Sequence, residues 1–448
     1  MALTGLEIYK SLPKENCKEC GLPTCLAFAM KVAAGQAGLD DCPRLSDEAR
    51  AELSQASAPP QRLVKIGADP NPIEVGQETV MFRHDDKFQH PTAVALTIAD
   101  DLDEDAVKTA CETFGKLQFT RVGETLKADM IALVNASGSP DKMMAVAEII
   151  YNELGVPMVL MGESCEALEA AATGPLSGTR PVLYCRGAQK AEELAAVAKQ
   201  AHAPLCAHCD LQTVADTVEA LEAAGVKDIL ISPPTNAPVT EALTFMTQAR
   251  RAALNKKFHP LGCPALAVAI GEDKMAAALD ACAYVAKYAA VLVTDAWEPY
   301  LLLPILTTRQ NIYTDPQKPV QVEPKLYEIG DVTDESPLLV TTNFSLSYYS
   351  VEAEVEGSRV PSYILAVDTE GTSVLTAWAA DKFNDETITA ALKSSGAEEK
   401  AKHHKLVLPG HVAVLAAGVA DESGWKVLVG PKEASGIGPF LKNDWNVV

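Results

Sequence analysis

The stretch DKMMAVAEIIYNELGVPMVLMG, residues 141–162, contains one complete helix-strand unit of the kind from which most of this chain is built. Its first part, 141–155, carries apolar side chains three and four residues apart, which predicts an amphipathic helix. A glycine ends that pattern, and the run VPMVLMG (156–162) that follows is almost wholly apolar. Such a run is typical of a strand buried on both faces of a parallel sheet.

Seven further strand-like runs lie between residues 92 and 300, separated by longer helical patterns such as 189–200, 210–225 and 273–288. The predicted strands are 92–100, 129–136, 156–162, 180–187, 204–210, 228–234, 264–271 and 289–297. Eight strand-helix units in about 210 residues predict a TIM (β/α)8 barrel, with an open doubly wound sheet as the second choice.

A second, smaller α/β region follows the predicted barrel. The alternation stops over residues 304–336, and the segment PQKPVQVEPKLYEIGDVTDESP (316–337) carries four prolines, which predicts a stiff and irregular interdomain connection. Strand candidates then alternate with helical patterns, which predicts a Rossmann-like, three-layer domain. The strand candidates are 337–343, 362–368, 404–410 and 424–430, and the helical patterns are 371–383, 385–396 and 411–424.

Four cysteines near the N-terminus are spaced Cys17-x2-Cys20-x4-Cys25-x16-Cys42, with Pro43 after the last. Thiolate sulfur is the ligand that a 4Fe-4S cluster takes, and the apolar residues 26–39 suit a short helix beside it. Structural zinc usually uses two similar pairs of cysteines, and disulfide frameworks belong to small secreted domains. We therefore predict a 4Fe-4S cluster as the metal group of this segment.

These patterns predict a multidomain α/β protein with three parts: a 4Fe-4S domain (1–57), the barrel (58–325) and a C-terminal cofactor domain (326–448). The 448 residues are 48% hydrophobic and carry a formal net charge of -22, which argues against nucleic acid as a partner. No apolar run approaches the ~18 residues of a membrane span, and no signal peptide is evident. We expect a cytoplasmic protein that does not bind membranes.

Three strand-to-helix junctions of the C-terminal region carry glycine or small hydroxyl residues, at 368–374, 408–413 and 430–440. Such junctions make a polar-rimmed crevice at the carboxyl ends of parallel strands, which predicts a cofactor pocket. The glycine fingerprints of dinucleotide and nucleoside triphosphate sites are absent from the sequence, and ordinary turn chemistry is the alternative explanation.

The motifs KENCKECGLPTCLAFAMKVAAGQAGLDDCP, GTSVLTAWAADKF, KLVLPGHVAVL and GPKEASGIGPF, together with the barrel, resemble the large (gamma) subunit of the corrinoid iron-sulfur protein of the acetyl-CoA decarbonylase/synthase system. The resemblance covers essentially the whole chain. It implies that the four cysteines hold the cluster, so the metal ligands are Cys17, Cys20, Cys25 and Cys42.

The resemblance also implies a methyl carrier of the reductive acetyl-CoA pathway. The corrinoid would accept methyl from methyltetrahydrofolate on a methyltransferase and deliver it, as methyl-Co(III), to the nickel centre of acetyl-CoA synthase. The cluster would serve the reductive reactivation of Co(II). The expected partners are therefore a smaller subunit, in a heterodimer, and these two enzymes. One corrinoid that serves several partners requires motion, so we expect the C-terminal domain to move as a rigid body about the connection 304–336.

The cobalt carries the chemistry in this scheme, so we predict no catalytic side chain, only residues that line a corrinoid pocket. These are Thr341, Leu346, Glu370, Gly371, Thr372, Ser373, Gly410, Glu433, Ala434, Ser435 and Gly436. Many corrinoid domains bring a histidine to cobalt from D-x-H-x-x-G, but none of the eight histidines here has an aspartate two residues before it. We therefore expect a base-off corrinoid without a protein histidine ligand, and we interpret His403, His404 and His411 as exposed loop or cap residues.

Two other functions remain open. The barrel itself could be a pterin-dependent methyltransferase, because polar residues follow its predicted strands, although such residues are also ordinary helix caps. These residues are Asp100, Asp101, Asn135, Asp210, Asp295 and Glu298. A plain electron carrier would leave about 400 residues without a role. Cys206, His208 and Cys209 could form half a metal site, but we interpret all seven remaining cysteines as packing residues.

Overall fold

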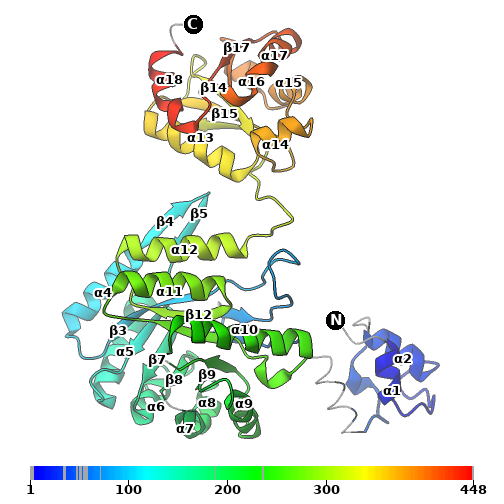
Figure 1. Ribbon diagram of the computed structural model, residues 1–448, viewed down its shortest axis with the longest axis vertical. Helices are drawn as coiled ribbons and strands as arrows, with labels where there is room; N and C mark the ends of the chain where they lie inside the picture. Colours follow the sequence, from blue (N-terminus) through cyan, green and yellow to red (C-terminus); the bar gives the residue numbers. More distant parts are fainter. Residues whose placement is uncertain are drawn as a thin grey trace. The chain divides into compact units, whose positions relative to one another are not determined.

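The computed structural model describes residues 5–33, 37–46, 49, 53, 59–70, 72–186, 188–234 and 237–445 (Figure 1). The chain divides into two compact units: Met1–Gln118 with Leu126–Tyr313, and Phe119–Thr125 with Thr314–Val448. The domain boundary predicted after residue 57 falls outside the described residues. No helix of the described residues combines the length and the apolar character that a membrane span needs.

The N-terminal segment has a small core of its own. Helices α1 (Gly5–Ser11) and α2 (Cys25–Ala33) pack together, and the short turn η1 (Leu39–Asp41) follows. Ile8, Phe28 and Leu45 are buried between them with Cys25 and Cys42. The helix predicted within residues 26–39 is confirmed as the shorter helix Cys25–Ala33, and the long loop 12–24 before it carries two of the four cysteines.

Eight parallel strands close into a barrel, and all eight correspond to the strands predicted from the sequence. They are β3 (Ala93–Ala99), β6 (Met130–Val134), β7 (Met158–Gly162), β8 (Val182–Cys185), β9 (Leu205–His208), β10 (Ile229–Ser232), β11 (Ala265–Ala269) and β12 (Ala289–Thr294). Their order around the barrel is β10-β11-β12-β3-β6-β7-β8-β9. Inward side chains such as Met130, Val159 and Leu266 fill the interior, and the antiparallel hairpin β1 (Leu63–Ile66) and β2 (Ile73–Gly76) adds Val64, Ile66 and Val75 to that core.

The barrel helices begin where the sequence provides caps. Asp103, Ser139, Ser164 and Asp273 each accept a backbone N-H of the first helical turn, which satisfies donors that have no partner within the helix. The helices are α4 (Glu104–Lys116), α5 (Pro140–Leu154), α6 (Cys165–Thr173), α7 (Ala188–Glu193), α8 (Ala195–Ala201), α9 (Val214–Ala223), α10 (Val239–Lys256), α11 (Lys274–Ala286) and α12 (Pro299–Tyr313), with the short turn η2 (His259–Leu261). A two-stranded hairpin, β4 (Gln118–Arg121) and β5 (Glu124–Lys127), follows α4.

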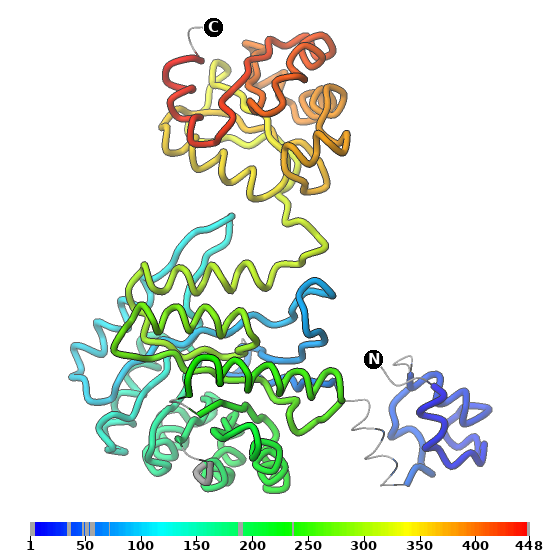
Figure 2. The backbone as a smooth tube through the Cα atoms, viewed as in Figure 1, coloured from blue at the N-terminus to red at the C-terminus, as the bar shows by residue number. Residues whose placement is uncertain are grey.

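The predicted connection 304–336 is wrong at both ends. Helix α12 continues through Pro304 to Tyr313, because burial of Leu301, Leu302, Ile305 and Leu306 offsets the hydrogen bond that the proline cannot make. At the other end, β13 (Leu326–Ile329) joins the C-terminal sheet. The connection without regular helix or ladder therefore spans residues 314–325, and the tube in Figure 2 follows it out of α12.

The C-terminal unit has a five-stranded sheet in the order β13-β15-β14-β16-β17. The four predicted strands, β14 (Leu338–Thr342), β15 (Ser362–Val367), β16 (Lys405–Leu408) and β17 (Lys426–Val429), are parallel. The unpredicted strand β13 pairs antiparallel with β15 at the edge. The sheet therefore differs from the prediction only by this added edge strand.

Helices cover both faces of this sheet, which gives the predicted three layers. Helices α13 (Ser345–Ser358) and α18 (Ile437–Asn443) bury Tyr348, Val355 and Leu441 on one face. The other face packs against α14 (Val374–Ala379), α15 (Asp385–Ser394), α16 (Ala397–Lys400), η3 (Gly410–Leu415) and α17 (Ala416–Ser423). From β14 the chain turns to β15 on one side, and it later returns to β16 on the other side. Ligands of open α/β sheets bind at such a reversal of strand order.

Candidate cofactor sites

The four N-terminal cysteines lie in one small segment. Cys25 opens α2 and Cys42 follows η1, and both thiols are buried in the core of the segment. Cys20 packs against the same core, and Cys17 lies three residues before it on the loop 12–24. An ion pair of Arg44 with Glu19 at 2.5 Å ties that loop to the chain beyond Cys42, and it lowers the pKa of Glu19.

The backbone of the cysteine loop has an unusual conformation. Lys14, Asn16, Lys18 and Gly21 have positive φ angles of 61°, 50°, 65° and 78°, and they flank Cys17 and Cys20. Non-glycine residues rarely adopt such angles, because the side chain approaches the backbone. Where right-handed and left-handed backbone conformations alternate, successive N-H groups can point to the same side and form a concave surface. Such surfaces bind anions, including many Fe-S clusters. The loop therefore has the backbone that an iron-sulfur cluster would need.

A single metal ion and a 4Fe-4S cluster place different demands on the four thiols. Among the described residues, no three His, Cys, Asp or Glu side chains converge closely enough to hold one metal ion. Zinc would require its sulfur ligands to meet around one centre, each about 2.3 Å from it. In a 4Fe-4S cluster each cysteine binds a different iron, so the sulfurs stand farther apart. All four cysteines are free thiols, so the disulfide alternative finds no support in the structure.

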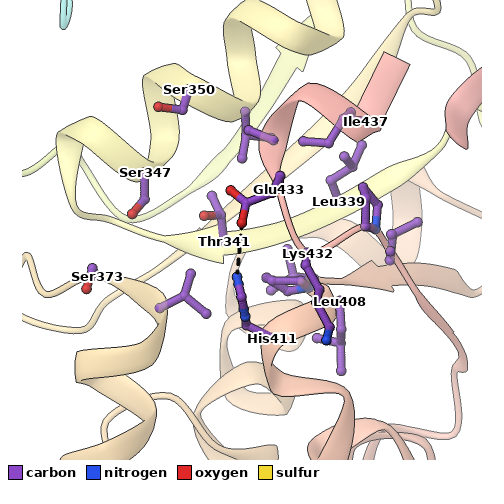
Figure 3. A pocket seen from close by; sticks show the side chains of 18 of the residues that line it. Leu339, Thr341, Ser347, Ser350, Ser373, Leu408, His411, Lys432, Glu433 and Ile437 are labelled. Carbon is purple, nitrogen blue, oxygen red and sulfur yellow. Dashed lines mark ion pairs between the residues drawn. The ribbon is translucent and has the colours of Figure 1, made fainter. Parts of the chain in front are cut away.

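A pocket of about 320 Å³ lies at the carboxyl ends of β14 and β16, where the strand order reverses (Figure 3). Strand ends, α13 and the loop after β17 supply its walls, which are mostly apolar. Hydroxyl groups of Thr341, Ser347, Ser350 and Ser373 add hydrogen-bonding capacity. The other lining residues are Leu339, Val340, Phe344, Leu346, Val351, Val374, Val407, Leu408, Pro409, His411, Gly430, Pro431, Lys432, Glu433, Ala434, Ile437 and Phe440.

The charged groups of the pocket lie on its exposed rim. His411 Nε2 and Glu433 Oε1 are 3.8 Å apart, and their side chains are 39% and 83% exposed, so water screens this pair (Figure 3). Lys432 comes from the same loop as Glu433. An apolar pocket with a few polar groups is typical of a site for an organic cofactor.

Five of the predicted pocket residues line this pocket: Thr341, Leu346, Ser373, Glu433 and Ala434. The other six, which do not line it, are Glu370, Gly371, Thr372, Gly410, Ser435 and Gly436. The sequence prediction missed Ser347 and Ser350 because it did not recognise α13, and it missed Pro409 and Pro431, which follow β16 and β17. The available signal was the position of both prolines within the predicted strand-to-helix junctions 408–413 and 430–440.

Three of the predicted glycines allow close packing behind the pocket. A Cβ atom on Gly410 would lie 2.5 Å from the carbonyl oxygen of Gly430, and one on Gly436 would lie 2.7 Å from Cβ of Pro431. Gly371 has a φ of 71°, and its Cβ would lie 2.9 Å from Cβ of Pro319. These residues shape the pocket through the approach of their backbones.

The three C-terminal histidines differ in their surroundings. His403 is a structural residue, because its Nδ1 accepts the N-H of Lys405 and its Nε2 lies 2.9 Å from the carbonyl oxygen of Ser336. His404 stacks at a tilt on Trp425. His411 is exposed, as predicted, and it also lines the pocket.

The carboxyl end of the barrel collects several of the polar residues predicted there. Asp100 is buried, and its carboxylate accepts hydrogen bonds from Asn135 Nδ2 at 2.6 Å and from the backbone N-H and hydroxyl of Ser137, both at 2.8 Å. Asp295 pairs with Lys274. Asp101, Asp210 and Glu298 are exposed, and backbone carbonyl groups of the last two accept N-H groups of the helices that follow. Thus the structure brings together only Asp100 and Asn135 of the predicted set.

The remaining seven cysteines lie in the barrel region, and all but Cys165 and Cys282 are buried. Burial raises the pKa of Cys206 well above its usual value and that of Cys209 to about 11, so both stay protonated near neutral pH. Burial also lowers the pKa of His208. Protonated thiols are poor metal ligands, which agrees with packing roles for this pair. The Sγ atoms of Cys165 and Cys185 lie 3.2 Å apart.

Comparison with known families covers nearly the whole chain. A family profile described as CO dehydrogenase/acetyl-CoA synthase delta subunit matches residues 63–441. A second profile, described as an Fe-S cluster, matches residues 12–44, which include all four N-terminal cysteines.

Two relatives align with this chain from end to end. The corrinoid/iron-sulfur protein large subunit of Moorella thermoacetica is 44% identical over 445 residues, which cover 99% of each chain. The acetyl-CoA decarbonylase/synthase complex subunit gamma of Methanothermobacter thermautotrophicus is 34% identical over 454 residues, which cover 98% of this chain and 99% of the relative.

Proposed function

Because this chain belongs to the family of corrinoid/iron-sulfur protein large subunits and acetyl-CoA decarbonylase/synthase gamma subunits, we propose that it carries methyl groups on a bound corrinoid. The observation that carries the proposal is the pocket at the reversal of strand order between β14 and β16. A site for an organic cofactor is expected at that position in an open α/β sheet.

The pocket residues suit the chemistry of a corrinoid, which combines an apolar macrocycle with amide side chains. Aliphatic residues such as Leu339, Val407 and Ile437 would cover the ring, and the hydroxyls of Thr341, Ser347 and Ser373 would bind amides. When bound, the corrinoid would supply a cobalt ion that can carry a methyl group. The role of the chain is to position that group and to exclude water from it.

The N-terminal segment would hold a 4Fe-4S cluster through Cys17, Cys20, Cys25 and Cys42. The buried thiols of Cys25 and Cys42 and the positive φ angles around Cys17 and Cys20 support this assignment. Clusters of this type can have very low reduction potentials, which suits the reactivation of an oxidised corrinoid. The segment would contribute thiolate ligands and backbone N-H groups that stabilise the anionic cluster.

The proposed partners are the smaller subunit of a heterodimer, a methyltetrahydrofolate:corrinoid methyltransferase and acetyl-CoA synthase. The name of the Methanothermobacter relative, which places that protein in an acetyl-CoA decarbonylase/synthase complex, supports a role beside partner subunits. A cytoplasmic location belongs to the same proposal. Methyltransferase activity of the isolated chain, without the partner enzyme, would instead favour chemistry on the barrel.

A base-off corrinoid without a histidine ligand is also part of the proposal, and His411 makes it testable. His411 lines the pocket and lies 3.8 Å from Glu433. An EPR spectrum of the Co(II) protein should show no hyperfine coupling to an axial nitrogen. If coupling appears and His411→Ala removes it, the histidine-free assignment is wrong.

Filling the pocket tests the site itself. Ser347 is half-buried on α13, so Ser347→Trp should place an indole in the pocket and prevent binding of cobinamide, a corrinoid without a lower base. Ser394→Trp is a matched control, because Ser394 is exposed on α15, on the other face of the sheet. Binding is followed by visible absorption of the anaerobic protein. Equal cobinamide binding by both variants would place the corrinoid elsewhere.

A further inference from the structure

Asn343 follows β14 directly and is fully buried behind the pocket. Its side-chain oxygen accepts three hydrogen bonds: from the N-H of Thr369 at 3.0 Å, from the hydroxyl of Thr369 at 3.1 Å and from the N-H of Gly371 at 3.1 Å. Its side-chain nitrogen donates to Gln321 Oε1 at 2.9 Å and to Asp368 Oδ1 at 3.1 Å. Both amide protons and the oxygen of this carboxamide are therefore used.

These hydrogen bonds fix the loop between β15 and α14. Thr369, Gly371 and Asp368 belong to this loop, which we call the pocket loop (368–373). Its last residue, Ser373, and the following Val374 line the pocket, whereas Glu370, Gly371 and Thr372 do not. Asn343 therefore does not line the pocket itself, but its carboxamide holds the loop that carries Ser373 into the pocket wall.

The same side chain reaches the connection that precedes the C-terminal sheet. Two backbone hydrogen bonds accompany the side-chain contact to Gln321. The N-H of Val322 donates to the carbonyl oxygen of Asn343 at 2.9 Å, and the N-H of Ser345 donates to the carbonyl oxygen of Val320 at 2.9 Å. Gly371 packs so closely on Pro319 that a Cβ atom would clash. Residues 319–322 are therefore part of the packed base of the pocket loop.

We propose that Asn343 is the positioning residue of the corrinoid pocket: it holds the pocket loop in the conformation that presents Ser373 and Val374 to the cofactor. This inference rests on the proposed corrinoid function. An asparagine is required chemically, because the position needs an acceptor for loop N-H groups and donors for Gln321 and Asp368. Aspartate could not donate, and alanine would leave buried N-H groups without partners.

The two sides of the carboxamide allow a matched test. Asn343→Ala removes the contacts to the loop and to the connection, whereas Gln321→Ala removes only one contact to the connection and changes an exposed residue. We expect Asn343→Ala to weaken cobinamide binding about tenfold or more, the factor that one lost buried hydrogen bond can produce. Gln321→Ala should weaken binding by no more than about threefold, because it removes one of the five hydrogen bonds of the carboxamide and leaves the loop side intact.

Hydrogen exchange separates positioning from general stabilisation. In the folded Asn343→Ala protein, the amides of Thr369 and Gly371 should exchange faster, while those of β14 and β15 stay protected. A folded Asn343→Ala variant with wild-type affinity overturns the inference. If Gln321→Ala weakens cobinamide binding as much as Asn343→Ala does, the inference is also overturned, because the loss of binding would then not depend on the contacts to the pocket loop.

Thr369→Val decides the question if Asn343→Ala does not fold. This change removes the hydroxyl that donates to Asn343 and to the carbonyl oxygen of Thr372, and it keeps the volume of the buried side chain. We expect about threefold weaker cobinamide binding, and unchanged binding would contradict the role of the loop contacts. If the wild-type chain itself binds no cobinamide, the proposed function fails, which is a separate result from a failure of these variants.

Discussion

Asn16 and Cys25 exchange two hydrogen bonds. The backbone N-H of Asn16 donates to Sγ of Cys25 at 3.4 Å, and the Oδ1 atom of Asn16 accepts the backbone N-H of Cys25 at 2.8 Å. The pair joins the cysteine loop to the first residue of α2, and Asn16 has a φ of 50°, which asparagine tolerates better than most residues. A hydrogen bond to the sulfur of a cluster ligand also affects the reduction potential.

We predict that Asn16→Ala weakens the iron-sulfur segment. The variant loses the bond to the Cys25 N-H, worth about 0.5–1.5 kcal/mol, and a side chain that tolerates positive φ. The anaerobically purified variant should hold less iron and sulfide per chain than the wild type and lose its cluster faster on exposure to chelator. Asn152→Ala, which changes an exposed residue of α5, should match the wild type. Equal cluster content and stability in all three proteins would argue against this role of Asn16.

Cys20→Ser should separate reductive reactivation from methyl transfer. In the proposed scheme the cluster is not on the path of the methyl group, so the variant should reactivate oxidised corrinoid poorly but transfer methyl almost normally from a chemically pre-reduced preparation. Both rates are measured on the same folded sample. A parallel loss of both would mean that the cluster segment also takes part in methyl transfer.

Gly410→Ala should distort the corrinoid pocket, although Gly410 does not line it. The new Cβ would lie 2.5 Å from the carbonyl oxygen of Gly430, and relief of that clash must move the loop that carries Lys432 and Glu433. We expect a loss of about 1–3 kcal/mol in stability and weaker cobinamide binding. Gly357→Ala is the control, because its Cβ meets nothing within 4 Å, and it should stabilise the protein by about 0.5–1 kcal/mol. Denaturant unfolding and visible titration check both results.

The barrel could be predicted from the sequence because each strand is buried on both faces. Runs such as MVLMG in β7 leave no polar position, and helices with caps at Ser139 and Ser164 flank it. Short buried strands that alternate with capped helices permit few architectures. The Fe-S segment could likewise be predicted from the spacing of its four cysteines, which the Fe-S profile over residues 12–44 includes, and their role as ligands stays a prediction.

Several parts depend on tertiary contacts and could not be predicted. Helix α13 buries Tyr348 and Val355, but SLSYYSVEAEVEGS has no continuous apolar stripe, so its pocket residues other than Leu346 were missed. Pro304 suggested the end of a helix, whereas packing of the surrounding leucines keeps α12 intact. Asn343 gave no signal, because its five hydrogen bonds join segments that meet only in the fold.

Motion of the C-terminal unit about the connection should be necessary for turnover. Residues 319–322 are bound to the C-terminal unit, so we expect the pivot within 314–318 instead of the whole predicted segment 304–336. A cleavable crosslink between the barrel and the C-terminal unit should leave cobinamide binding intact and suppress methyl transfer to at least one partner. Cleavage of the crosslink should restore transfer. Normal rates with both partners in the crosslinked protein would exclude the shuttle motion.

Single-turnover methyl transfer tests the central claim most directly. The chain is loaded with corrinoid, reduced under anaerobic conditions and mixed with methyltetrahydrofolate labelled in its methyl group and a catalytic amount of the methyltransferase. The account predicts that about one labelled methyl group per chain moves to the protein-bound corrinoid, and that the Ser347→Trp variant receives none. Label that stays on the folate, although the same methyltransferase methylates free cobinamide, would contradict it.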